Sequence, residues 1–272
     1  MTALARERDV AVEAARAAAA IVCRHYKTDF EVEMKGHDDP LTAADRDSNA
    51  CIQEAILRAF PTDGWLSEET ADSTERLTKR RVWIVDPLDG TKEFTQHIPE
   101  FCVCIALVED GRPIVAVEIN PAAERLYCAV RGQGTTVNGE PARVSAQRDV
   151  AHAEVLASRS EDRRGEWDVF KRRCRVVLTG SVAFKLAELS TGHGDATFTL
   201  TPKNEWDICA GSLLVEEAGG RVTGLDGMPL RFNQPSPLRP GMIASNGLLH
   251  DGLLALIAEL GDQVPKSPPR RR

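Results

Sequence analysis

The sequence has little of several features that mark particular classes of protein. Aromatic residues make up only 5% of the chain, and no apolar run reaches the length of about 18 residues that a membrane-spanning helix needs. The seven cysteines are odd in number and contain no C-x-x-C pair, which argues against a disulfide framework or a metal site. We therefore expect reduced, buried thiols in a cytoplasmic protein without a membrane span.

Positive charge is also in the minority, with 34 Lys and Arg residues against 41 Asp and Glu and a net charge of -7. This balance argues against a nucleic-acid polymer as partner, because the phosphate backbone requires a basic face. It still allows a small phosphorylated substrate, because a bound cation can reverse the local field. Glu13 and Arg16 interrupt the Ala-rich start, so this stretch predicts a helix and not a signal peptide.

The first half of the chain has the pattern of helices followed by strands. Helical spacing of apolar residues predicts helices at 3–26 and 44–60, with a polar loop or short hairpin at 31–45 and a turn at 61–65. Strand-like runs follow at 82–86, 101–109, 113–120 and 125–130. Asp110-Gly111 and Asn138-Gly139 predict tight turns. We expect helices packed on an antiparallel or mixed sheet.

From about residue 150, strand-like and helical segments alternate, which is typical of an α/β arrangement. The predicted strands are 154–158, 175–179, 196–200 and 219–223, and the predicted helices are 167–173, 182–190, 206–218 and 247–260. We therefore predict an N-terminal α+β lobe at 1–145 and a C-terminal α/β lobe at 146–264. The Pro- and Arg-rich residues 265–272 predict a disordered tail.

The segment VWIVDPLDGTKEF at 82–94 concentrates residues that could carry chemistry. Four apolar residues lead directly into Asp86, and Gly90 permits a sharp turn after Asp89. Two carboxylates held this way repel each other unless a cation lies between them, and Mg²⁺ prefers such oxygen ligands. Residues 90–92 open a predicted helical turn, whose free N–H groups can bind phosphate oxygens. Metal ligands beside a phosphate cradle predict phosphoryl chemistry.

Further acidic residues lie beside turns, namely Asp45 in LTAAD, Glu68 and Glu69 in WLSEE, and Asp207 in NEWD. Each has a structural explanation as well. Asp45 and Asp207 fit the first turn of a helix, where a carboxylate complements the helix dipole, and Glu68 could be a solvated loop charge. Taken singly, these residues do not distinguish a site from a surface.

Taken together, four segments resemble the inositol monophosphatase superfamily in their order and spacing, from about residue 35 to 220. They are LTAAD, LSEE, DPLDGTKEF and EWDICAG. The signatures D-P-[ILV]-D-G-T and W-D-x-[AC]-[AG]-[AGP] are both present. The resemblance implies a layered α-β-α-β-α sandwich, a mixed α+β and α/β fold. It also implies a phosphatase that binds two or three Mg²⁺ ions, is inhibited by Li⁺, and is a monomer or homodimer.

The resemblance further implies roles for the matching residues. The metal ligands would be Glu68, Asp86, Asp89, Asp207 and the main-chain carbonyl of Leu88. The substrate-binding residues would be Asp89, Gly90, Thr91, Gly180, Ser181, Lys185 and Asp207. Asp45 would pair with Thr91, whose hydroxyl would orient the attacking water, and Glu68 would help to take the proton. The role of Glu69 stays open.

Within the superfamily, DGTKEF and GSVAFK (180–185) are more similar to the 3'(2'),5'-bisphosphate nucleotidases, since classical inositol monophosphatases tend to have DGTTNF. This predicts hydrolysis of the 3'-phosphate of adenosine 3',5'-bisphosphate, a by-product of sulfur metabolism. Lys185 suits a second phosphate and equally a solvated helix charge. Phe184 and the KNEWD segment depart from the family pattern. The alternatives are an inositol or broad sugar-phosphate phosphatase and a non-catalytic phospholigand-binding relative.

Overall fold

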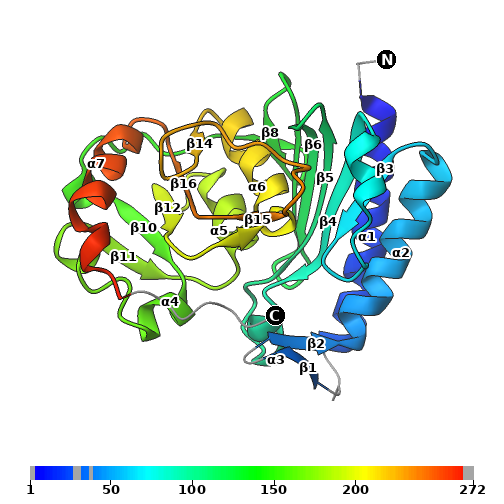
Figure 1. The fold of residues 1–272 in the computed structure, drawn as a ribbon, viewed down its shortest axis with the longest axis horizontal. Coiled ribbons are helices and arrows are strands. Elements are labelled where there is room, and N and C mark those ends of the chain that lie inside the picture. The colour runs from blue at the N-terminus through cyan, green and yellow to red at the C-terminus, as the bar shows by residue number, and fades with distance from the viewer. Residues whose placement is uncertain (1–3, 27–31, 37–38, 266–272) are drawn as a thin grey trace.

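The computed structural model describes residues 4–26, 32–36 and 39–265. Its elements alternate in layers of helix, sheet, helix, sheet and helix (Figure 1). Three separate hydrophobic clusters fill the spaces between the layers. This arrangement confirms the predicted sandwich. We keep the names N-terminal lobe and C-terminal lobe for residues on either side of the proposed boundary at 145.

Two long helices form the first layer, α1 (Ala5–Tyr26) and α2 (Ala43–Ala59). Small buried residues such as Ala11, Ala15 and Ala18 let α1 approach its neighbours closely. The predicted hairpin before α2 is present as β1 (Val32–Gly36) and β2 (Asp39–Thr42), which pair antiparallel. A capping box between Thr42 and Asp45 begins α2, because these side chains satisfy main-chain N–H groups at the helix start.

The second layer is a seven-stranded sheet of the N-terminal lobe, in the order β3-β4-β5-β6-β7-β8-β9. Its strands are β3 (Gly64–Ser67), β4 (Arg81–Asp89), β5 (Cys102–Glu109), β6 (Arg112–Asn120), β7 (Arg125–Val130), β8 (Thr135–Val137) and β9 (Glu140–Ala142). Only β3 and β4 pair in parallel. Asp110-Gly111 and Asn138-Gly139 turn with positive φ at both residues, as predicted for tight hairpins.

Two short elements near β4 differ from the sequence-based prediction. The predicted turn at 61–65 is shorter, since residues 64 and 65 already belong to β3. The four residues of β3 are too few to reveal an alternating pattern. β4 continues to Asp89 instead of ending at 86. Between these strands lies the 3-10 helix η1 (Thr74–Thr78), and after β4 comes the predicted helical turn, α3 (Thr91–Thr95).

The third layer contains α5 (Val182–Leu189) and α6 (Glu205–Glu217), which pack between the two sheets. The second sheet has the order β11-β10-β12-β16-β14. Its strands are β10 (Glu154–Ala157), β11 (Arg175–Leu178), β12 (Ala196–Thr199), β14 (Arg221–Thr223) and β16 (Met242–Ser245). β10 is parallel to β11 and β12, whereas β16 is antiparallel to both its neighbours. The alternation therefore does not extend to the end of the chain, and β16 is an unpredicted strand.

The outermost layer contains α7 (His250–Leu260), three residues shorter than predicted at its start. The predicted helix at 167–173 is wrong, since only turns and the 3-10 helix η3 (Phe170–Arg172) occur there. Trp167 and Phe170 bury their rings against Phe198. These ring contacts hold the loop in place although the segment is not an α-helix. The remaining elements are α4 (Arg159–Arg163), β13 (Lys203–Asn204), β15 (Leu238–Arg239), η2 (Val150–His152) and η4 (Gly261–Gln263).

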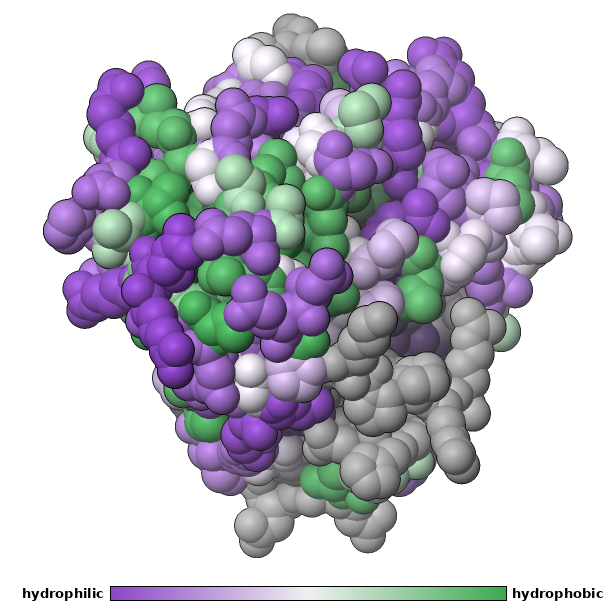
Figure 2. All heavy atoms as spheres, turned by 60° about the vertical axis from the view of Figure 1, so that its left-hand side comes forward, coloured by the Kyte–Doolittle hydropathy of each residue, from purple (hydrophilic) through white to green (hydrophobic). Residues whose placement is uncertain are grey.

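The surface and the thiols agree in part with the predictions from composition. Hydrophilic residues cover much of the face in Figure 2, with smaller hydrophobic groups between them. Within the described ranges, every helix is too short or too polar to cross a membrane. All seven cysteines are free thiols. Four are buried as predicted, including Cys102 and Cys104 on β5, whereas Cys23, Cys51 and Cys128 are only partly buried. The predicted tail beyond Pro265 lies outside the described residues.

Candidate active site

A bulge in β4 places Asp86 and Asp89 on the same face of the first sheet. Side chains three residues apart on a regular strand point to opposite faces. Here Asp86 pairs with Cys104 and Asp89 pairs with Cys102, so three steps along β4 match two steps along β5. The extra residue restores the common face. The D-P-L-D spacing thus aims both carboxylates at the C-terminal lobe, whose helices cover Cys102 and Cys104.

Two more carboxylates reach this face from elsewhere in the chain. Glu68 directly follows β3 and donates its main-chain N–H to the carbonyl of Val85, 3.3 Å away, which sets it beside Asp86. Asp207 comes from the first turn of α6 in the other lobe. One carboxylate oxygen from each of Glu68, Asp86 and Asp207 lies within 4.8 Å of the others. The predicted convergence is therefore present for these three residues, whereas Asp89, which was predicted with them, does not belong to this group.

The electrostatics of Asp86 fit a bound cation. Its side chain is buried, and Oδ1 accepts a hydrogen bond from the Leu88 N–H at 3.0 Å. Oδ2 is buried without a hydrogen-bond partner among the described residues. Burial, followed by the charges of Glu68, Asp89 and Asp207, raises the pKa of Asp86 well above its usual value. An all-oxygen set with one orphaned oxygen suits a hard divalent cation such as Mg²⁺.

Asp89 differs from the other three because it also joins the two lobes. Its Oδ2 accepts a hydrogen bond from the Ala183 N–H at 2.8 Å and another from the Ser181 hydroxyl. Both donors belong to the start of α5. Burial raises the pKa of Asp89, although these hydrogen bonds oppose the shift. Oδ2 is thus engaged by the C-terminal lobe, and any metal contact of Asp89 falls to Oδ1.

Asp45 and Thr91 lie together although they are 46 residues apart. Oδ2 of Asp45 accepts hydrogen bonds from the N–H and hydroxyl of Thr42, both at 2.7 Å. Oδ1 lies 3.1 Å from the Thr91 hydroxyl oxygen, which is also 3.0 Å from the Leu88 carbonyl oxygen. Asp45 therefore caps α2 and contacts Thr91 at the same time, so the structural and functional explanations both apply.

Close approach of the lobes at this point requires glycine at position 90. Gly90 has φ of +92°, in the left-handed region that favours glycine. A Cβ atom there would lie 2.8 Å from the Glu100 carbonyl oxygen and 3.0 Å from Cβ of Ser181. Ser181 itself has φ of +51° and caps α5 through its hydroxyl. A larger residue at 90 would push the lobes apart.

A pocket of about 400 Å³ joins these residues. Its lining includes the predicted residues Glu68, Leu88, Asp89, Gly90, Thr91, Ser181, Lys185 and Asp207. The volume lies in the usual range for small-molecule sites. Lys185 is only 5% exposed, so it is not a solvated helix charge. Phe184 packs against the core between the sheets and does not line the pocket.

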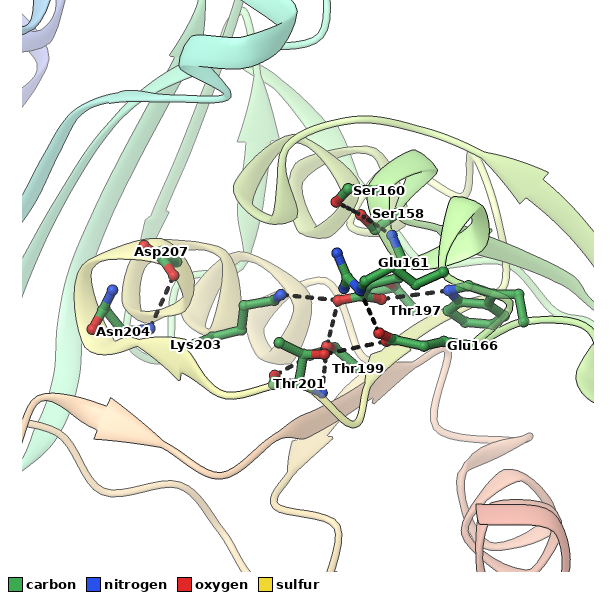
Figure 3. A network of polar contacts seen from close by, with 12 residues as sticks. Ser158, Ser160, Glu161, Glu166, Thr197, Thr199, Thr201, Lys203, Asn204 and Asp207 are labelled. Carbon is green, nitrogen blue, oxygen red and sulfur yellow. Dashed lines mark hydrogen bonds and ion pairs between the residues drawn. The ribbon is translucent and has the colours of Figure 1, made fainter. Parts of the chain in front are cut away.

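The C-terminal side of the pocket carries residues that sequence reasoning missed. Lys203 reaches from the segment before α6 toward Glu161, and its Nζ lies 2.9 Å from Oε1 of that residue (Figure 3). Glu161 is 3% exposed and also accepts from the Thr199 hydroxyl at 2.7 Å. Burial alone would raise the pKa of Glu161, but the charges of Lys203 and Lys185 lower it. The one sequence signal was the position of Lys203, immediately before NEWD.

Comparisons with known proteins agree with this geometry. A model of the inositol monophosphatase family matches residues 4–262. Inositol monophosphatase 2 of Solanum lycopersicum is 34% identical over 227 residues, which cover 79% of this chain and 85% of that protein.

Two solved structures extend the similarity to the fold. The inositol monophosphatase from Anabaena has a TM-score of 0.80 and 30% identity, with 97% of this chain and 98% of that chain covered. CysQ from Bacteroides thetaiotaomicron, described as a bacterial member of the inositol monophosphatase family, has a TM-score of 0.76 and 30% identity. The match covers 91% of this chain and 99% of the CysQ chain. With its layered fold and converging carboxylates, the chain belongs to the inositol monophosphatase family of metal-dependent phosphatases.

Proposed function

We propose that this phosphatase removes the 3'-phosphate of adenosine 3',5'-bisphosphate, as a magnesium-dependent 3'(2'),5'-bisphosphate nucleotidase. The observation that carries the proposal is Lys185. Its side chain lines the pocket and is almost buried, and it has no ion pair or hydrogen bond with any residue in the described ranges. A second phosphate on the substrate would supply the missing anion.

The surroundings of Lys185 support an anionic ligand. Burial lowers the pKa of Lys185, and the carboxylates of Glu161, Asp89 and Glu93 oppose that shift. Lys203 lines the same pocket. A substrate with one phosphate at the acidic cluster and a second at these lysines would be held at both ends, which a monophosphate cannot match.

The residues of the acidic cluster would hold the metal ions. Glu68, Asp86 and Asp207 fit one Mg²⁺, with Asp89 and the Leu88 carbonyl as further proposed ligands for a total of two or three ions. When bound, such ions activate water and stabilise the leaving oxygen of an in-line displacement. We propose that main-chain N–H groups of Gly90 and Thr91, which line the pocket, bind the scissile phosphate.

Asp45 and Thr91 would position the attacking water. The oxygens of Asp45 are fixed by Thr42 and Thr91. When the Thr91 hydroxyl donates to Asp45 or to the Leu88 carbonyl, its oxygen can still accept a hydrogen bond from a water molecule in the pocket that Thr91 lines. Glu68, in the same pocket, would take the proton. Each side chain then has a task in water attack on phosphorus.

Phosphate release from three substrates tests the proposal. Adenosine 3',5'-bisphosphate, adenosine 3'-monophosphate and inositol 1-phosphate are compared with Mg²⁺, and then with Li⁺ added, which we expect to inhibit. We expect the bisphosphate to have the highest kcat/KM. Lys185→Met should lower this value about 10- to 100-fold for the bisphosphate and much less for the monophosphate, since a charged hydrogen bond contributes about 1.5–3 kcal/mol.

Lys79→Met is the matched control, because Lys79 makes only a surface ion pair with Glu75 and such pairs contribute about 0–1 kcal/mol. A higher kcat/KM for inositol 1-phosphate than for the bisphosphate would contradict the nucleotide assignment. In that case an inositol or broad sugar-phosphate phosphatase would be the better description, with the same metal cluster.

A further inference from the structure

Two carboxylates of the N-terminal lobe hold the segment at 180–183 of the C-terminal lobe. Glu100 accepts a hydrogen bond from the Gly180 N–H and forms an ion pair with Arg159. Asp89 accepts from Ser181 and from the Ala183 N–H. The Gly180 N–H, the Ser181 hydroxyl and the Ala183 N–H are therefore already used by carboxylates that hold the two lobes together.

A third carboxylate, Glu93 on α3, lies against the same segment without such a task. Apart from its own main-chain N–H, its carboxylate has no hydrogen-bond donor and no ion pair among the described residues. The nearby Gly180 N–H is bound to Glu100. Glu93 lines the pocket together with Asp89, Thr91 and Lys185.

Glycine at position 180 makes room for this carboxylate. A Cβ atom on Gly180 would lie 2.3 Å from Cγ and 2.4 Å from Oε1 of Glu93. The side chain of Glu93 thus occupies the space that a side chain at 180 would fill. Its position depends on a residue of the other lobe, and a single methyl group at 180 would displace the flexible end of Glu93.

An acceptor in this setting calls for a donor from a ligand. Burial raises the pKa of Glu93, and the charge of Lys185 is among the opposing effects. A partly buried carboxylate whose one donor in the described parts of the chain is its own main-chain N–H still has unpaired acceptor oxygens, which is costly because most buried polar groups in proteins are hydrogen-bonded. A hydroxyl group of the bound substrate would supply that donor.

We propose that Glu93 is a specificity-determining residue, which accepts a hydrogen bond from the substrate hydroxyl on the carbon next to the phosphate ester. On α3, Glu93 follows Thr91 by two residues, and both residues line the pocket. A substrate whose phosphate ester lies at Thr91 therefore has its neighbouring hydroxyl in the same cavity as Glu93. The inference rests on the proposed phosphatase site but not on the nucleotide, since ribose 3'-phosphates have one such hydroxyl and inositol 1-phosphate has two, at C2 and C6.

Substrate pairs that differ in this hydroxyl test the inference. Wild-type enzyme is assayed with Mg²⁺ on adenosine 3',5'-bisphosphate and on its 2'-deoxy analogue. We expect a ratio of kcat/KM values of about 10–100 in favour of the hydroxyl, as for a hydrogen bond to a charged group. In Glu93→Ala the ratio should fall toward one.

Gly180→Ala provides a second variant in which the carboxylate is displaced but still present. It should reduce the ratio as Glu93→Ala does, and the double variant should reduce it no further, because both changes remove one interaction. Glu100→Gln is the matched control. Glu100 holds the same segment, so loss of its charge should lower kcat/KM for both substrates by the same factor and leave the ratio of the two kcat/KM values unchanged.

An unchanged ratio in Glu93→Ala, with equal losses on both substrates, would overturn the inference and leave Glu93 with a structural role. Failure of the proposed nucleotidase has a different signature, in which wild-type enzyme releases no phosphate from either nucleotide. The same comparison is then made with inositol 1-phosphate and its 2-deoxy and 6-deoxy analogues. A ratio of about 10–100 for one of these pairs that falls toward one in Glu93→Ala supports the inference, and ratios that Glu93→Ala leaves unchanged for both pairs contradict it.

Discussion

Asp86 and Glu118 are two buried carboxyl groups of the first sheet, and they lie in the same row across its strands. Asp86 on β4 pairs with Cys104 on β5, which in turn pairs with Glu118 on β6. The exposed fractions are 1% for Asp86 and 0% for Glu118. Both have oxygens without a hydrogen-bond partner within the described parts of the chain, and burial is the main reason that both pKa values are raised.

The two groups differ in what surrounds them. Asp86 faces Glu68 and Asp207, which line the open pocket and whose charges raise the pKa of Asp86 further. Glu118 is covered by α6, where a Cβ on Gly211 would lie 3.1 Å from its Oε1, and only Asp89 adds to the effect of burial. Burial alone therefore favours a protonated carboxyl, whereas convergence of several carboxylates at a pocket creates a place for a cation.

The largest expected effect comes from Asp86→Asn, which removes one charge with little change in volume. We expect kcat to fall more than about 100-fold, because even residues that only orient metal ligands cost about 10–100-fold when changed. Phosphate release under saturating Mg²⁺ measures this. Asp110→Asn, in an exposed turn, is the control. Near wild-type turnover of Asp86→Asn would exclude Asp86 as a ligand.

Magnesium should stabilise the protein through Asp86 and not through Glu118. At about 100 times its dissociation constant, Mg²⁺ would raise the free energy of unfolding by about 2.7 kcal/mol. Thermal unfolding with Mg²⁺ and with a chelator measures this difference. Asp86→Asn should lose most of the stabilisation, and Glu118→Gln should keep it. Equal responses of the two variants would remove the contrast between the two groups.

Replacing Glu118 by methionine should stabilise the protein. The change removes a buried carboxyl group without partners, whose burial costs about 1–3 kcal/mol, at similar volume. We expect the free energy of unfolding to rise by about that amount in urea denaturation, with activity retained. A lower free energy of unfolding would mean that Glu118 has a partner that stabilises the folded state.

The smallest expected effect is a slope of stability with pH in the presence of a chelator. Since folding raises the pKa of both Asp86 and Glu118, the folded state binds more protons, and stability is lost as pH rises above the unfolded values of about 4. Glu118→Met should make this slope shallower. Added Mg²⁺ should also make the slope shallower, through Asp86. A slope that neither Glu118→Met nor Mg²⁺ alters would contradict the raised pKa values of both groups.

The acidic side of the site could be predicted because its residues lie in short local motifs. Asp86 and Asp89 are three residues apart, and Glu68 and Asp207 stand in similarly distinct segments. The hairpins at 110–111 and 138–139 were predictable for the same reason, since their residue types fit positive φ values. The short strands β3 and β16 were not, because four residues contain too little periodic signal.

The other side of the pocket could not be predicted from local patterns. Glu93 and Lys203 look like ordinary solvated charges in the sequence, and Glu161 lies in a polar stretch. Their placement depends on how α3, α4 and the segment before α6 pack around one cavity. The sequence left Lys185 equally suited to bind a phosphate or to be a solvated helix charge, and its burial in the structure excludes the solvated charge.

The sequence by itself determined the family and, through that resemblance, the layered fold and the carboxylates proposed as metal ligands, because the resemblance follows from motifs within single segments. Only the tertiary structure decided which charges are left without partners. A hydrogen bond or ion pair depends on distances between segments far apart in the chain, as between Glu93 and Gly180, and such distances exist only after the lobes have packed together.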